Sequence, residues 1–377
     1  MEIVVMGETP WRRRLYASMC GRPAGSPWGQ LGLATLRLGS VLYSSVTQGW
    51  QASYAAGMRR RKRLPCRVVS IGNLTVGGTG KTPLTMWVAR WYQRHGWRVA
   101  VLSRGYGART ARPLQVVSTG DGPLADWQTV GDEPYLLACS LPGVPVLIGK
   151  NRYRSGRYAC DHFGTQVVVL DDGFQHCGLF RDLDVVLLDA SNPFGHGALL
   201  PRGILREPVS ALRRADAIVL TRVDMAAAPV PVLRQQVCSY SKGRPIYGVT
   251  MAAEALWQQD RAVADGLAWL HRRRVVAFAG IGNPQAFVAT LQQLGSEVAA
   301  CVSFPDHYCY TAPDWQVIVQ VARRQQATCL VTTEKDAIRL PVSWQTDMPV
   351  YVLRIGARFV QGEPALQQQL AAVMAYA

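Results

Sequence analysis

Residues 72–83 read Gly-Asn-Leu-Thr-Val-Gly-Gly-Thr-Gly-Lys-Thr-Pro, and this stretch decides the fold class. Gly80, Lys81 and Thr82 match the last three positions of the Walker A pattern GxxxxGK(S/T), whose first position holds Thr75 instead of glycine. An apolar run typical of a buried strand precedes the stretch, and a helix is predicted to follow it. A glycine-rich loop between a strand and a helix is the setting in which proteins bind phosphate groups.

The loop supplies the chemistry that phosphate binding needs. Its glycines let the backbone turn so that the N–H groups point at phosphate oxygens. Lys81 would reach the β- and γ-phosphates, and the hydroxyl of Thr82 would bind Mg²⁺. We therefore expect a nucleoside triphosphate to be bound by the loop residues Thr75, Val76, Gly77, Gly78, Thr79, Gly80, Lys81 and Thr82.

Short apolar runs alternate with helical segments along the first two thirds of the chain. Strands are predicted at residues 67–71, 97–102, 167–170, 185–188 and 217–221, with a helix over residues 81–95. Nearly continuous β-branched or leucine runs are typical of strands that are buried on both faces. The pattern predicts an α/β fold of the P-loop NTPase type, with a mostly parallel sheet and helices on both faces.

The pattern changes near residues 240–275, where an extended connector over residues 246–251 leads to further strand and helix signals. These predict a smaller α/β domain, with strands at residues 275–279 and 329–333 and a helix at residues 284–294. The expected organisation is an N-terminal amphipathic membrane-associated segment (1–62), a P-loop core (63–245), a smaller C-terminal domain (246–360) and a C-terminal helix (361–377) that could pack back on the core.

Asp171 and Asp172 end an apolar strand about 90 residues after the loop. They resemble the end of a Walker B strand, where a carboxylate holds Mg²⁺ directly or through water. Thr221-Arg222-Val223-Asp224 follows another apolar strand and resembles the (N/T)KxD element by which GTPases read guanine, with arginine in place of lysine. An aspartate at a turn or at the start of a helix explains Asp224 equally well.

The chain has 377 residues and a formal net charge of +16, which favours an anionic partner, either nucleic acid or an acidic membrane surface. Nine scattered cysteines without CxxC pairs predict reduced thiols rather than a disulfide framework or a zinc site. The sequence shows no cleavable signal peptide and no apolar run long enough to span a bilayer.

Residues 29–46 are the most apolar part of the N-terminal region, and they predict an amphipathic helix. One helical face would carry Leu31, Ala34, Thr35, Leu38, Val41 and Leu42. Basic residues flank the stretch at Arg12, Arg13 and Arg14 and at Arg59, Arg60, Arg61, Lys62 and Arg63. The arrangement suits a helix that lies in the interface of an anionic leaflet, and a core helix followed by a solvated basic loop is the alternative.

Five further strings carry a resemblance to a known family. They are Ser103-Arg104-Gly105-Tyr106-Gly107, Gly131-Asp132-Glu133-Pro134, Asp171-Asp172-Gly173-Phe174-Gln175-His176, Leu200-Pro201-Arg202-Gly203-Ile204-Leu205-Arg206-Glu207-Pro208 and Phe304-Pro305-Asp306-His307-Tyr308. Together with residues 72–83 they closely resemble the tetraacyldisaccharide 4′-kinase family of lipid A biosynthesis, over about residues 15–355. Threonine at the first Walker A position is itself a feature of that family.

The resemblance implies that ATP, with Mg²⁺, phosphorylates the 4′-hydroxyl of a tetraacyldisaccharide 1-phosphate to give lipid IVA, a precursor of lipid A in lipopolysaccharide. Its acceptor lies in the cytoplasmic leaflet of the bacterial inner membrane, so peripheral or monotopic attachment to that anionic surface is expected. No nucleic-acid-binding module is present among the motifs.

The resemblance also implies roles for single residues. Asp132 would be the base that activates the acceptor hydroxyl, and His307 would orient Asp132 and tune its pKa. Their contact would require the second domain to close over the first, which would also exclude water. A structural surface histidine is the alternative for His307. Lys81 would contribute to catalysis, and Asp171 and Asp172 would organise Mg²⁺.

Other matching positions would contact the substrate or the transition state. They are Tyr106, Arg152, His176, Arg206 and Glu207, with Gln175 beside His176. Arginines there could stabilise charge on the transferring phosphoryl group or hold the 1-phosphate of the acceptor. A plain ion pair with Arg202 or Arg206 is the alternative for Glu207.

Two other function classes compete with the lipid kinase. A P-loop GTPase switch or metallochaperone-like protein would be supported by Thr221 to Asp224 alone and would prefer guanine nucleotides. A nucleic-acid-stimulated ATPase would be supported by net charge alone, and its turnover would respond to DNA or RNA with a steep salt dependence.

Overall fold

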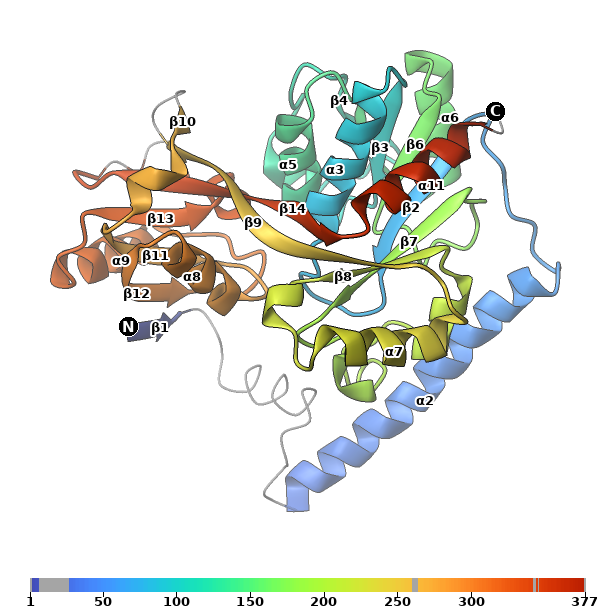
Figure 1. Ribbon diagram of the computed structural model, residues 1–377, viewed down its shortest axis with the longest axis horizontal. Coiled ribbons are helices and arrows are strands. Elements are labelled where there is room, and N and C mark those ends of the chain that lie inside the picture. The colour runs from blue at the N-terminus through green and yellow to red at the C-terminus, as the bar shows by residue number, and fades with distance from the viewer. Residues whose placement is uncertain (1, 7–26, 260–263, 342–343, 345, 376–377) are drawn as a thin grey trace. The chain divides into compact units, whose positions relative to one another are not determined.

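The computed structural model describes residues 2–6, 27–259, 264–341, 344 and 346–375. The chain divides into two compact units. The larger unit contains Trp11–Thr250 and Ala357–Ala377, and the smaller unit contains Met1–Pro10 and Met251–Gly356. The chain leaves the larger unit within strand β9 (Ile246–Gln258) and returns to it within strand β14 (Val350–Gln361) (Figure 1).

The sheet of the larger unit has the strand order β9-β8-β7-β2-β6-β3-β5-β4. Its remaining strands are β2 (Arg67–Asn73), β3 (Val99–Ser103), β4 (Gln115–Ser118), β5 (Val146–Ile148), β6 (Val167–Asp171), β7 (Leu183–Asp189) and β8 (Ala217–Thr221). All neighbours pair in parallel except β4, which is antiparallel to β5. The sheet is therefore mostly parallel, as the sequence predicted.

The central strands are buried on both faces, which explains their unbroken apolar sequences. Side chains of alternate residues point to opposite faces. Val168 and Leu170 of β6 pack in a cluster with Ala159 of helix α6 (Arg152–Phe163). Helix α3 (Lys81–Arg94) packs against β2, β3 and β6.

The other described helices of the larger unit are α2 (Pro27–Ala55), α4 (Trp127–Val130), α5 (Asp132–Ser140), α7 (Val230–Ser241) and α11 (Glu363–Ala375), with short 3₁₀ helices at Gly195–Gly197, Val209–Arg214 and Val223–Met225. Helix α6 shows why these segments begin and end where they do. The side chain of Asn151 accepts a hydrogen bond from the backbone N–H of Arg154 at its start. Gly164, at a φ of 58°, ends it in the left-handed conformation.

The smaller unit contains a parallel sheet with the order β1-β12-β11-β13-β14. Its elements are β1 (Glu2–Val5), β10 (Ala264–Asp265), a 3₁₀ helix at Leu267–Leu270, β11 (Arg274–Ala279), α8 (Pro284–Gln293), β12 (Glu297–Ser303), α9 (Ala312–Arg324), β13 (Cys329–Thr333) and α10 (Glu334–Ala337).

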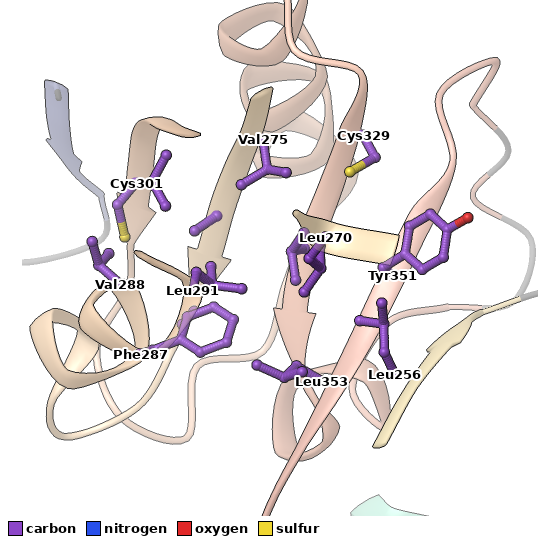
Figure 2. Close-up of a cluster of buried hydrophobic side chains, with 14 residues drawn as sticks. Leu256, Leu270, Val275, Phe287, Val288, Leu291, Cys301, Cys329, Tyr351 and Leu353 are labelled. Carbon is purple, nitrogen blue, oxygen red and sulfur yellow. The ribbon is translucent and has the colours of Figure 1, made fainter. Parts of the chain in front are cut away.

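The core of the smaller unit follows the alternation of its strands. Val275 and Ala277 of β11 face a cluster that includes Phe287 and Leu291 of α8 (Figure 2). The alternate residues Val276 and Phe278 belong to a second cluster, which includes Trp315 and Ile318 of α9. Apolar residues on both faces of one strand therefore bury helices on both sides of this sheet as well.

The fold class predicted from the sequence is confirmed, as are the strands and helices that were placed by apolar periodicity. The amphipathic helix expected over residues 29–46 is α2, which is longer than the pattern indicated. The basic residues Arg12 to Arg14 lie outside the described residues. The limits 1–62, 63–245, 246–360 and 361–377 for independent domains stay a prediction.

Candidate active site

The phosphate loop of residues 75–82 connects β2 to α3, at the carboxyl edge of the larger unit's sheet. Gly77 and Gly80 have φ angles of 104° and 85°, which residues other than glycine rarely adopt. The side-chain amide of Asn73 donates to the hydroxyl of Thr79 over 2.8 Å, and both residues are buried. A buried hydrogen bond thus fixes the start of the loop to Thr79, and the glycines permit the φ angles that the turn requires.

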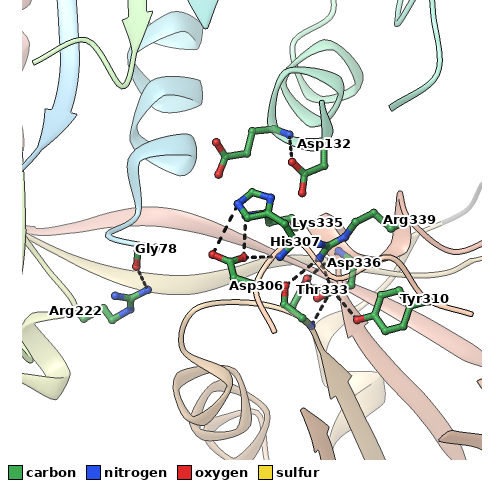
Figure 3. Close-up of polar contacts among 12 residues, drawn as sticks. Gly78, Asp132, Arg222, Asp306, His307, Tyr310, Thr333, Lys335, Asp336 and Arg339 are labelled. Carbon is green, nitrogen blue, oxygen red and sulfur yellow. Dashed lines mark hydrogen bonds and ion pairs between the residues drawn. The ribbon is translucent and has the colours of Figure 1, made fainter. Parts of the chain in front are cut away.

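The end of β8 holds the same loop from a second direction. The hydroxyl of Thr221 donates to the carbonyl of Thr79 over 3.0 Å. Nη2 of Arg222 donates to the carbonyl of Gly78 over 2.7 Å (Figure 3). Nη1 of Arg222 pairs with Asp189 at the end of β7. Thr221 and Arg222, which resembled part of a guanine-reading element, therefore contact the phosphate loop.

Asp172 lies just beyond β6 and faces two cations. Nη1 of Arg206 lies 2.8 and 2.7 Å from its two carboxylate oxygens, and Nζ of Lys81 lies 3.7 Å from Oδ1. Burial acts to raise the pKa of Asp172, but the charges of Lys81 and Arg206 hold that pKa below its ordinary value. The loop lysine and the strand-end carboxylate thus lie together, as the two motifs predicted.

Asp171, the last residue of β6, is 1% exposed. Its carboxylate accepts hydrogen bonds from the hydroxyls of Thr85 at 3.2 Å and Ser103 at 3.3 Å. Burial raises the pKa of Asp171 to about 7, and the nearby carboxylates of Glu133 and Asp172 add to the rise. Burial and the neighbouring carboxylates therefore oppose the ionisation of Asp171 more than Lys81 and the hydrogen bond from Thr85 favour it.

Arg152 and His176 were predicted to lie near the substrate, and both lie near the carboxylates or cations of this site. Arg152 is 2% exposed and donates from Nη1 to the carbonyl of Gly149 over 2.8 Å. Burial lowers the pKa of Arg152 to about 10, against the opposing effect of Asp171 and Asp172, so Arg152 stays a cation. Burial, helped by the charge of Arg152, lowers the pKa of His176 to about 4, so His176 is neutral near pH 7.

Glu207 is a buried carboxylate with two side-chain hydrogen-bond donors. Glu207 is 1% exposed and accepts hydrogen bonds from Arg214 and from Gln51 of α2, each over 2.6 Å. The alternative that paired Glu207 with Arg202 or Arg206 is wrong, because the ion-pair partner is Arg214.

Gln175 lies between the loop and the arginine that binds Asp172. It donates to the carbonyl of Asn73 over 3.0 Å and accepts from Arg206 over 3.2 Å. Tyr106, by contrast, is 70% exposed and follows β3. The five predicted contact residues therefore divide into four partly or fully buried side chains and one exposed phenol.

Asp132 is the first residue of α5 and is 6% exposed. Its Oδ1 accepts a hydrogen bond from the backbone N–H of Glu133 over 2.9 Å. His307 belongs to the smaller unit, where it has a φ of 61°. Because the two residues lie in different units, their pairing stays a prediction.

His307 has charged neighbours within its own unit (Figure 3). Its backbone N–H donates to Asp306 over 3.1 Å, and Nε2 lies 3.4 Å from Nζ of Lys335. Lys335 also pairs with Asp306 at 3.2 Å. Sequence reasoning missed Lys335, which stands in Thr-Glu-Lys-Asp after an apolar strand, a strand-end position of the kind that drew attention to Asp171.

The comparisons with known proteins agree on one family. The model of the tetraacyldisaccharide-1-P 4′-kinase family matches residues 33–375. A tetraacyldisaccharide 4′-kinase from Syntrophus aciditrophicus is 41% identical over 92% of this chain and 93% of its own. One from Anaeromyxobacter dehalogenans is 42% identical over 93% of each chain.

Solved structures agree with the sequences. The crystal structure of an apo-form LpxK from Aquifex aeolicus in complex with ATP has a TM-score of 0.74 and 32% identity to this chain, and it covers 91% of this chain and 99% of its own. Because the family model spans most of the chain and several relatives exceed 40% identity, this chain belongs to the tetraacyldisaccharide-1-P 4′-kinase family.

Proposed function

We propose that this chain is a kinase that transfers the γ-phosphate of ATP to the 4′-hydroxyl of a tetraacyldisaccharide 1-phosphate and thereby makes lipid IVA for lipid A biosynthesis. One observation carries the proposal: Lys81 of the phosphate loop and Arg206 both contact Asp172 at the carboxyl edge of a parallel sheet. In doubly wound α/β folds, nucleotides bind at that edge.

The phosphate loop would bind the nucleotide through its backbone N–H groups and the N-terminal end of α3. Lys81 would contact the β- and γ-phosphates. Arg206 and Arg152 are the cations best placed to stabilise charge on the transferring phosphoryl group, because both are near Asp172. The GTPase alternative loses its support, since Thr221 and Arg222 contact the loop itself.

The residues present fit a magnesium ion. Asp171 and Asp172 are adjacent carboxylates, and burial together with neighbouring carboxylates already raises the pKa of Asp171. A divalent cation would offset that charge. Among the described residues no cluster of three or more histidine, cysteine or carboxylate side chains suits a metal. Magnesium commonly uses one or two carboxylates with phosphates and water, so Thr82, Asp171 and Asp172 are the proposed ligands. Bound there, Mg²⁺ would neutralise charge on the phosphates.

Asp132 is the proposed general base. Its carboxylate would take the proton of the 4′-hydroxyl as that oxygen bonds to the γ-phosphorus, while the bond from phosphorus to the β-phosphate oxygen breaks and ADP leaves. The proposed role of His307 is to orient Asp132. Tyr106, His176 and Glu207 are proposed to contact or position the acceptor.

The proposed location is the cytoplasmic face of a bacterial inner membrane. None of the helices in the described part of the chain has the length and apolar character that crossing a bilayer requires. Helix α2 instead exposes apolar side chains, with Leu38, Val41, Leu42 and Val46 each more than 60% exposed. Basic residues 59–63 are also exposed. An anionic lipid surface would cover the apolar face and attract the cations.

The decisive experiment measures transfer of labelled γ-phosphate from ATP to tetraacyldisaccharide 1-phosphate in detergent micelles. We expect labelled lipid with the wild type and none with Lys81→Ala. Competition by unlabelled ATP and GTP tests nucleotide preference in the same assay. A folded protein that binds ATP but labels no lipid would overturn the proposal.

A further inference from the structure

Helix α2 has two faces of different character. The residues of the less exposed face recur every three or four positions. They are Leu33, Leu36, Ser40, Tyr43, Thr47, Gln51 and Tyr54. The opposite face is the exposed apolar one described above. Five of these seven side chains carry a hydroxyl or an amide, which is unusual for a helix that packs on a core. Its polar side chains therefore call for specific partners.

Three of them, Ser40, Tyr43 and Gln51, have partners in residues 198–207, which we name the bridging segment. The hydroxyl of Ser40 donates to the carbonyl of Leu199 over 2.9 Å and accepts from the backbone N–H of Arg202 over 3.0 Å. Tyr43 donates to the carbonyl of Arg206 over 3.0 Å. These bonds fix the bridging segment along the helix by its backbone.

A side-chain bond and a close approach complete the contact. Gln51 donates to the buried carboxylate of Glu207 over 2.6 Å. Gly39 lies so close to the bridging segment that a Cβ there would be 3.1 Å from the ring of Pro201. The helix therefore contacts the bridging segment at Gly39, Ser40, Tyr43 and Gln51, over more than three turns.

The bridging segment also pairs with the start of the phosphate loop. The N–H of Arg206 donates to the carbonyl of Leu74 over 2.7 Å, and the N–H of Val76 donates to the carbonyl of Ile204 over 2.8 Å. Thr75 and Leu205 form an antiparallel bridge between these bonds. The same segment thus holds α2 on one side and the nucleotide loop on the other.

We propose that Tyr43 and Gln51 are positioning residues that couple the contact of α2 with an anionic lipid surface to the affinity of the phosphate loop for nucleotide. The proposal rests on the proposed function for the lipid-facing side of α2. Lipid bound to the exposed face favours the docked helix, the docked helix holds residues 198–207, and these hold Leu74 to Val76 and Arg206. Nucleotide and lipid surface then bind with positive coupling.

The chemistry of the Tyr43 phenol suits its role as a hydrogen-bond donor to the bridging segment. Burial raises the pKa of Tyr43, with the nearby Glu207 adding to the rise and Arg206 opposing it. The phenol thus keeps its proton and remains a donor to the carbonyl of Arg206 near neutral pH. Phenylalanine fills the same space without that bond, so Tyr43→Phe removes the contact and leaves the helix packing in place.

The test measures the Kd of a non-hydrolysable ATP analogue with Mg²⁺, with and without vesicles of phosphatidylethanolamine and phosphatidylglycerol. Wild type is expected to bind the analogue about five-fold more tightly when vesicles are present, at the low end of usual coupling. Tyr43→Phe and Gln51→Leu are expected to sediment with vesicles as wild type does but to lose most of this gain. The assay contains no acceptor, so its result is separate from that of the phosphoryl-transfer assay.

Glycine variants of α2 and the effect of nucleotide on vesicle binding provide two further tests. Gly39→Val presses against Pro201 and should also uncouple the two sites, whereas Gly49→Val on the same helix meets no described atom within 4 Å of its Cβ and should behave as wild type. Coupling is reciprocal, so the analogue must tighten vesicle binding by the same factor. A vesicle effect that is absent in wild type, or unchanged in folded Tyr43→Phe, Gln51→Leu and Gly39→Val, overturns the proposal.

Discussion

Arg206 donates from a single nitrogen, Nη1, to both carboxylate oxygens of Asp172, at 2.8 and 2.7 Å. Lys81 lies 3.7 Å from the same carboxylate. Asp172 is also a proposed ligand of Mg²⁺. Arg206 therefore holds in place a carboxylate that would bind the metal in the proposed site, and a metal ion there would release the guanidinium to contact the phosphates.

Replacing Arg206 by glutamine should lower kcat by about 100-fold, the usual cost of losing one donor to a developing charge. KM for ATP should change much less, because Lys81 and the loop backbone still bind the phosphates. Steady-state kinetics at saturating acceptor measures both constants. Arg213→Gln, at an exposed position seven residues further on, serves as the matched control and should keep wild-type kinetics.

Thr221→Val should loosen the phosphate loop. The valine leaves the carbonyl of Thr79 without its hydroxyl donor in a buried place, which costs about 1–3 kcal/mol. We expect a lower free energy of unfolding in urea and a raised Kd for ATP. Thr221→Ser retains the hydroxyl and should restore ATP affinity. A valine variant with wild-type affinity, or a serine variant that loses as much affinity as the valine variant, would contradict the role given to this hydrogen bond.

Asp132→Asn should lower turnover by about 100- to 10,000-fold while ATP binding stays nearly unchanged, as expected for loss of a general base. A comparable loss of ATP affinity would instead assign Asp132 to metal or nucleotide binding. His307→Ala tests the proposed pairing through a double-mutant cycle. If the two residues act as one unit, the double variant should be about as slow as the Asp132 variant alone.

His176 should make the protein less stable in acid. Its folded-state pKa is lowered to about 4, first by burial and then by Arg152 and Arg181. An unfolded histidine titrates near ~6.5. The unfolded chain thus takes up a proton first as pH falls, and the stability that is fully present above about pH 6.5 is lost progressively towards pH 4.

The measurement for this prediction is the free energy of unfolding as a function of pH. His176→Gln should flatten the fall between about pH 6.5 and pH 4, since glutamine does not titrate. The same substitution at the exposed His162 should leave the slope unchanged. Parallel curves for wild type and His176→Gln would contradict the assignment.

Local patterns were sufficient to predict much of the fold. The buried strands β2, β6, β7 and β8 can be recognised in the sequence by their apolar runs, because both of their faces are covered. Strand β1 was not predicted, since a four-residue segment with three apolar residues identifies a strand only once β12 is known to pair with it. The path of the chain through β9 and β14 is likewise set by pairing and not by composition.

The site was predictable where neighbours in sequence are neighbours in space. The phosphate loop and the Asp171-Asp172 pair each sit within one short string. The contacts of Gln51 with Glu207, of Arg214 with Glu207 and of Arg222 with the loop join residues that no string connects. Such contacts depend on tertiary packing. The sequence around a single arginine or glutamine does not indicate which distant residue it will contact.

Helix α11 has a consequence for how the protein is made. It comes after the whole smaller unit in the sequence, yet it belongs to the larger unit, where Tyr92 of α3 donates to the carbonyl of Leu370 over 3.0 Å in a buried place. A ribosome must therefore release residues 251–356 before the nucleotide-binding unit has all its parts. The smaller unit can therefore fold on the nascent chain while the larger one still lacks α11.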